Sequence, residues 1–283
     1  MKEYKKILIL FRRQWITSFT RKRVLAGYLI GLISSFMTGI NYYRFLGNHT
    51  ANFGEAFVQH FSSTGNLTLM LLGFVLAMSD APFIHTDSFL MIHRSGRKCW
   101  YVSTWLYIVM QAAVYYECSL VLTALCIFPK AYFHNIWSRA LINYADSITM
   151  RNGITVPFGA QMTDYTPYTA ICHTFLLVLL YSILLASILY ALNLYVHTAV
   201  GTIVVGIIHL LGVLIKTMGM FMSVLLPWSY MINAMFYCHM DGEITLLHSY
   251  VFFLLSIYIV YLIGQLGVRR ADFQLLESGD ADA

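Results

Sequence analysis

The sequence predicts an all-α integral membrane protein that forms one transmembrane domain over residues 1–283. Two features of its composition support this class, since 59% of the residues are hydrophobic and only 11% are charged. An ordinary soluble domain carries roughly 25% charged residues. In addition, the apolar residues gather into runs of about 20, the length at which a helix crosses a bilayer core about 30 Å thick. We therefore expect a multi-pass protein of the cell membrane.

Six apolar runs are predicted to span the bilayer. The second is densely apolar only over residues 67–78, because its first half holds several polar side chains, among them His60 and Asn66. The predicted spans are residues 24–43, 59–79, 101–128, 169–192, 197–215 and 246–268.

Residues 1–23 are predicted to form an amphipathic helix at the cytoplasmic membrane surface. Clusters of apolar residues alternate there with Lys5, Lys6, Arg12 and Arg13. This pattern suits a helix that lies along the inner leaflet and places its cations among the lipid headgroups. A simple cationic anchor for the first span is the alternative interpretation.

The distribution of cations predicts the orientation of the chain. With the N-terminus inside, 13 of the 18 Lys and Arg residues fall on the inner side. Positively charged residues are enriched in cytoplasmic segments of membrane proteins. We therefore expect the N-terminus, the 80–100 segment and the 269–283 tail to be cytoplasmic.

Two long segments are then predicted on the outer side. Residues 129–168 form an outer loop that carries apolar residues at helical spacing. Residues 217–245 are apolar enough to enter the membrane but are interrupted by Gly219 and Pro227. A single crossing there would move the C-terminal cations outside, so re-entrant outer helices are the better interpretation.

No signature of an enzyme site is present in the sequence. Motifs for a phosphate-binding loop, a dinucleotide fold, a zinc protease and a serine nucleophile elbow are all missing. No two histidines stand at the i, i+4 spacing of a helical metal site. The cations flank apolar runs and form no basic stripe, which argues against nucleic acid as a partner. We predict no catalytic residue, metal or cofactor site in this chain.

Two features inside the predicted spans are candidates for function. Glu117 is a carboxylate deep in the third span, and we expect it to face the bundle or a wet cavity. It is either a substrate-path group or a neutral side chain hydrogen-bonded across helices. In the first span Gly27, Gly31, Ser35 and Gly39 recur every four residues. This stripe of small residues suits either packing within the chain or a dimer seam.

The segment at residues 80–100 combines helix signals with a cluster of cations. Thr86 and Asp87 are capping residues, an apolar patch follows, and Gly96 is a typical helix stop. These signals predict a short amphipathic cytoplasmic helix that offers a docking surface. A topological retention signal is the alternative role.

Taken together, these features resemble the permease subunits of ABC-2 type (type V) ABC transporters. The resemblance rests on the amphipathic N-terminal helix, the six spans, the broken apolar segment before the last span, and an acidic residue before the stretch "LMIHRSGRKCWYVSTWLY". It implies that residues 80–100 form a coupling helix seated in a groove of a separate ATPase subunit. The implied coupling positions are Asp87, Phe89, His93, Arg94 and Arg97, with Asp87 standing where the family usually has Glu. The outer loop at 129–168 is longer than in many members.

The resemblance implies the membrane subunit of an ATP-driven exporter. The chain would not be an enzyme itself, since the partner ATPase binds ATP and Mg. A second permease protomer, in a homodimer, would complete the path, and the cargo would be amphipathic or hydrophobic: a peptide, an antimicrobial, a lipid or a drug. Two alternatives remain open, a peptide-sensing or immunity subunit that binds through residues 129–168, and a membrane-embedded enzyme that uses Glu117.

Overall fold

The computed structural model describes residues 3–81, 92–144, 162, 165–196, 198–218 and 246–270, and these residues are predominantly helical. A two-stranded parallel sheet joins two connections at one end of the bundle. The helices are α1 (Glu3–Ser18), α2 (Lys22–Leu46), α3 (Glu55–Ser62), α4 (Thr64–Met78), α6 (Arg97–Ile127), α7 (Arg139–Tyr144), α9 (Pro167–Tyr195), α10 (Thr198–Met218) and α13 (Leu246–Arg270), with the 3-10 turn η1 (Phe128–Lys130) and the strands β1 (Ala51–Asn52) and β2 (Ala131–Tyr132).

Among the described residues, four helices, α2, α6, α9 and α13, are long and apolar enough to cross a membrane. They coincide with the first, third, fourth and sixth predicted spans. The second predicted span is a helix pair, α3 and α4, bent by 90°, and counting this pair as one broken span adds a fifth crossing. The fifth predicted span is α10, whose apolar stretch, Val200–Leu214, belongs to a shorter class of helix. Most of the predicted re-entrant segment, residues 219–245, lies outside the described residues.

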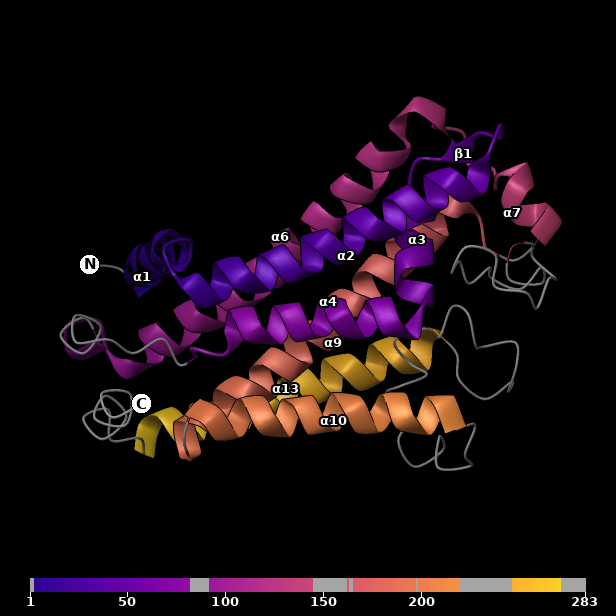
Figure 1. Cartoon of the computed structure of the whole chain (residues 1–283). Coiled ribbons are helices and arrows are strands. Elements are labelled where there is room, and N and C mark those ends of the chain that lie inside the picture. The colour runs from indigo at the N-terminus through magenta and orange to yellow at the C-terminus, as the bar shows by residue number, and fades with distance from the viewer. Residues whose placement is uncertain are drawn as a thin grey trace.

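Helix α9 occupies the middle of the bundle (Figure 1) and packs against α3, α4, α6, α10 and α13. Its inward side chains are fully enclosed, with Leu177, Val178 and Leu185 each 0% exposed. Helix α2 packs against α4 and α6 at the side of the bundle away from α13 (Figure 1).

The predicted N-terminal helix is present as α1. Figure 1 shows α1 nearly end-on where α2 lies lengthwise, so the two helices cross steeply. One face of α1 packs on α6: Leu10 is buried, the Trp15 and Tyr107 rings lie edge to face at 6.3 Å, and Gln14 Nε2–H donates to Thr104 Oγ1 at 3.1 Å. The opposite face exposes apolar residues, which suits a helix at a membrane surface.

The stripe of small residues on α2 faces other helices of the same chain. A Cβ atom added at Gly27 would overlap a backbone oxygen of α4, and one at Gly31 would overlap a tyrosine hydroxyl of α6. A Cβ at Gly39 would lie 2.6 Å from the Cβ of a cysteine on α6. The Ser35 Oγ lies 2.7 Å from a serine hydroxyl of α6. Small side chains here let the backbones approach closely.

A buried carboxyl group holds the beginning of the 129–168 segment onto the bundle. Glu55, at the start of α3, is 0% exposed and accepts hydrogen bonds from the Tyr42 hydroxyl at 2.6 Å and from the Ser138 backbone N–H at 2.7 Å. Nearby, Asn52 Nδ2–H donates to the carbonyl of His134 at 2.7 Å. Residues 131–144 are therefore attached to β1 and α3, while residues 145–161 lie outside the described part of the chain.

Candidate functional site

The predicted coupling segment connects α4 to α6. Residues 82–91 lie outside the described residues, so the structure says nothing of Asp87 and Phe89. The returning part begins with one helical turn, residues 92–95, that ends at Gly96, where φ is +91°. This left-handed region favours glycine because it has no Cβ. The side chains of His93 and Arg94 are exposed, so both are available to a partner.

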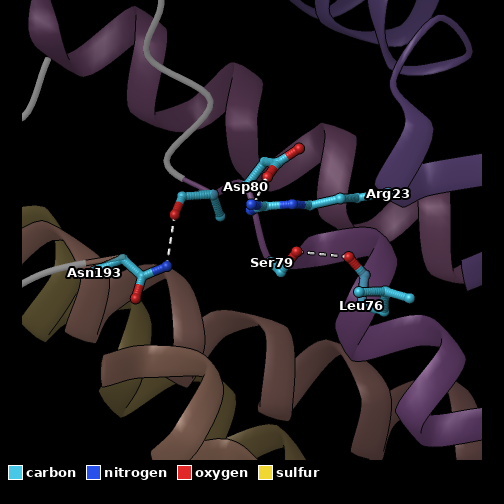
Figure 2. Close-up of polar contacts among 6 residues, drawn as sticks. Arg23, Leu76, Ser79, Asp80 and Asn193 are labelled. Carbon is cyan, nitrogen blue, oxygen red and sulfur yellow. Dashed lines mark hydrogen bonds and ion pairs between the residues drawn. The ribbon is translucent and has the colours of Figure 1, made fainter. Parts of the chain in front are cut away.

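The outgoing end of this segment is bonded to two other helices (Figure 2). Asp80 forms an ion pair with Arg23 of α2 at 2.6 Å, and the carbonyl of Ala81 accepts a hydrogen bond of 2.6 Å from Asn193 Nδ2–H. The ion pair is half-exposed, which makes its contribution to stability small. The hydrogen bond from Asn193 is buried and therefore costs more to break.

Asn193 is a polar junction between three helices. Its side chain is 0% exposed, and its Oδ1 accepts the backbone N–H of Gly201 at 3.1 Å. Gly201 lies in the first turn of α10. A Cβ at Gly201 would overlap Asn193 Oδ1, so a residue without a side chain is required. One amide thus joins the ends of α4 and α9 to the start of α10.

The returning end of the segment is bonded to α13. The Arg97 guanidinium donates to the carbonyls of Val268 at 3.3 Å and Arg269 at 2.8 Å, the last carbonyls of that helix. A cation is favourable at a helix C-terminus, where carbonyls lack intrahelical partners. Farther along α6, the Tyr101 hydroxyl donates to the carbonyl of Tyr261 at 2.6 Å. Arg97, which the resemblance assigns to the ATPase interface, therefore contacts its own chain.

The same end of the bundle is strongly cationic. Arg21 stands at the turn between α1 and α2, and burial lowers the pKa of its guanidinium, while nearby Tyr107 and Asp80 oppose the shift. We call this region the cationic end; its Lys and Arg residues are Arg21, Lys22, Arg23, Arg94, Arg97, Lys98, Arg269 and Arg270.

Glu117 faces outward, contrary to the expectation that it lies against the bundle. The buried positions around it on α6 are taken by Tyr115, Tyr116 and Ser119, and helical geometry turns residue 117 to the opposite side. Its side chain is exposed, and among the described residues no hydrogen bond or ion pair reaches it. Within the part of the chain that the structure describes, the Glu117 side chain lines no interior path and makes no hydrogen bond to another helix.

Sequence reasoning missed Asn193 and Glu55. An asparagine inside the apolar run "LYALNLYV" is the signal that points to the first. The signal for the second is a carboxylate that follows a glycine at the start of a helix. Within the described ranges no group of three or more His, Cys, Asp or Glu residues is arranged to hold a metal ion.

No protein-family model, no curated protein and no solved structure matches this chain.

Proposed function

We propose that the chain is the membrane-spanning permease subunit of an ATP-driven ABC exporter, that it crosses the membrane six times, and that a separate ATPase docks at its cationic end. In this proposal the bent pair α3/α4 and the helix α10 are the second and fifth crossings. A second copy of the chain completes the transport path.

The observation that carries this proposal is the attachment of the 80–100 segment at both of its ends. The outgoing end is bonded to α2 through Arg23 and to the α9–α10 junction through Asn193. The returning end is bonded to α13 through Arg97. A displacement of this segment is therefore transmitted to four helices at once. An exporter driven by an ATPase in another chain requires such a connection, because the free energy of ATP hydrolysis must reach helices that do not touch the nucleotide.

The charge of this end supports a cytoplasmic location. Cationic segments are retained on the cytoplasmic side of membranes, where ATP and its hydrolysing subunits are found. The exposed pair His93 and Arg94 lies beside the anchored Arg97 and is the surface that we assign to the ATPase contact. Arg97 keeps a positioning role, since it holds α13.

The apolar outer surfaces and aromatic-rich helices suit an amphipathic or hydrophobic cargo, such as a membrane-active peptide, a lipid or a drug. A peptide-sensing or immunity subunit is the second candidate. It is favoured by residues 131–144, which are attached to the bundle and expose Phe133 (64%) and Ile136 (65%). The membrane-embedded enzyme has no observation in its favour, since Glu117 stands away from the buried polar groups of the bundle.

The test is photo-crosslinking in the native membrane. A photoreactive amino acid at Arg94 should capture a soluble ATPase subunit, and the same probe at Ile136, on the opposite end of the bundle, should not. The Arg94→Glu variant should insert normally but lose the ATPase on purification, whereas Lys130→Glu should retain it. Recovery of the tagged wild-type chain without any ATPase would overturn the proposal.

A further inference from the structure

Glu117 sets the outer surface of α6 apart from the other outward surfaces of the bundle. It lies well inside α6, and its neighbours on the same side are exposed apolar residues: Met110 (39%), Val121 (50%) and Leu125 (60%). The outward sides of α2 and α13 present comparable apolar residues, such as Ile33 and Leu255. Among the spanning helices that the structure describes, Glu117 is the only Asp, Glu, Lys or Arg away from the helix ends.

Lipid chains offer this carboxyl group nothing to bond. Polar groups at membrane depth are satisfied by protein or by a wet cavity, and intramembrane carboxyl groups mark places where such a partner is present. The described part of the chain supplies no hydrogen bond or ion pair to Glu117. A partner from outside the described helices is therefore required.

We propose that the outward surface of α6 around Glu117 is the docking surface for a second copy of this chain, in which the two Glu117 carboxyl groups bond to each other. Two copies inserted in the same direction are related by an axis along the membrane normal, so each residue on the axis meets its own equivalent. Each Glu117 therefore meets Glu117 of the other copy. Among the described spanning helices, this is the one acidic or basic group exposed at that depth. A protonated carboxyl group both donates and accepts a hydrogen bond, which makes the pair self-complementary.

The spacing of the neighbouring residues fits this arrangement. Met110, Val114, Glu117 and Val121 follow one another at intervals of four, three and four residues. This interval is the heptad seam along which two parallel helices pack, and a single polar residue within such a seam fixes its register. Polar side chains also promote association between helices in membranes. This inference rests on the proposed function only in assuming that a second protomer is present.

Cysteine crosslinking tests the docking surface directly. The five native cysteines are replaced by serine, and single cysteines are introduced at Met110, Val121, Ile33 and Leu255 in the full chain with Glu117 intact. Oxidation in native membranes should give disulfide-linked dimers at 110 and 121. The matched positions 33 and 255, on the outward sides of α2 and α13, should give none. Crosslinking at 33 or 255 in place of 110 and 121 would overturn the proposal, and so would the absence of dimers at all four positions.

The role of the carboxyl group is tested separately, by energy transfer between labelled copies in liposomes. Glu117→Leu should weaken dimer association about tenfold, which is the size of an interhelical hydrogen bond in membranes. Glu117→Gln, which still donates and accepts, should weaken it far less. Equal association of all three proteins would show that Glu117 is not the contact. Neither experiment involves the ATPase, so a failure here leaves the ATPase capture at Arg94 as an independent result.

Discussion

Replacing Asn193 by alanine is expected to loosen the cationic end of the bundle. The change removes two buried hydrogen bonds, 2.6 Å to the carbonyl of Ala81 and 3.1 Å from the N–H of Gly201, and leaves both backbone groups without a partner. Each unsatisfied buried group costs about 1–3 kcal/mol, so the expected loss of stability is about 2–6 kcal/mol. The matched control is Asn41→Ala, because Asn41 is exposed on α2 and should change stability by no more than about 0.5 kcal/mol.

The measurement is hydrogen exchange by mass spectrometry, together with thermal unfolding of the purified protein in detergent. A loss of about 2.8 kcal/mol corresponds to roughly hundredfold faster exchange of the Gly201 amide if it exchanges by local opening. The effect should extend to the end of α4, because Ala81 loses the same partner. If the Gly201 amide exchanges at the wild-type rate and the unfolding temperature is unchanged, Asn193 does not join these helices in the way we describe.

Three further substitutions test other contacts. Gly27→Ala forces α2 away from α4 and should lower the free energy of unfolding by about 1–3 kcal/mol, measured by thermal unfolding. At the control position Gly65 no atom lies within 4 Å of an added Cβ, so Gly65→Ala should be neutral or stabilising. Glu55→Ala leaves two buried donors unpaired and should cost about 2–6 kcal/mol, with faster proteolysis of residues 131–144. Glu55→Gln keeps an acceptor and should be milder. Equal proteolysis of the wild type and both variants would contradict the attachment of residues 131–144 through Glu55. Arg97→Gln should speed amide exchange at the end of α13 with a stability loss of at most about 1 kcal/mol, while Lys98→Gln should leave that exchange unchanged.

Much of the bundle could be predicted from the sequence because the length of an apolar run is a local property. Helices α2, α6, α9 and α13 follow directly from it. The bend between α3 and α4 could not be predicted in this way. Polar residues weakened the apolar signal there, but the 90° turn depends on how α3 is enclosed by α2, α6 and α9.

The location of the candidate site could be predicted from the sequence, but its contacts could not. The cations and the glycine stop pointed to residues 80–100, and Gly96 indeed ends a helical turn with a positive φ. The partners did not follow from the sequence. Arg97 meets α13 across 172 residues, and Asn193 meets Ala81 across 112. Such pairings depend on which helix ends are brought together, and no local pattern records that.

From the sequence alone one can predict helices long and apolar enough to span a membrane, the places where the cations gather, and one carboxylate inside such a helix. The folded bundle is needed to see that Glu117 faces outward and that the small residues of α2 face α4 and α6. The physical reason is that lipid chains are as apolar as a protein core, so hydropathy does not distinguish the two sides of a spanning helix. In a soluble protein the polar side of a helix faces water. In this bundle the direction is set by which side chains pack against neighbouring helices.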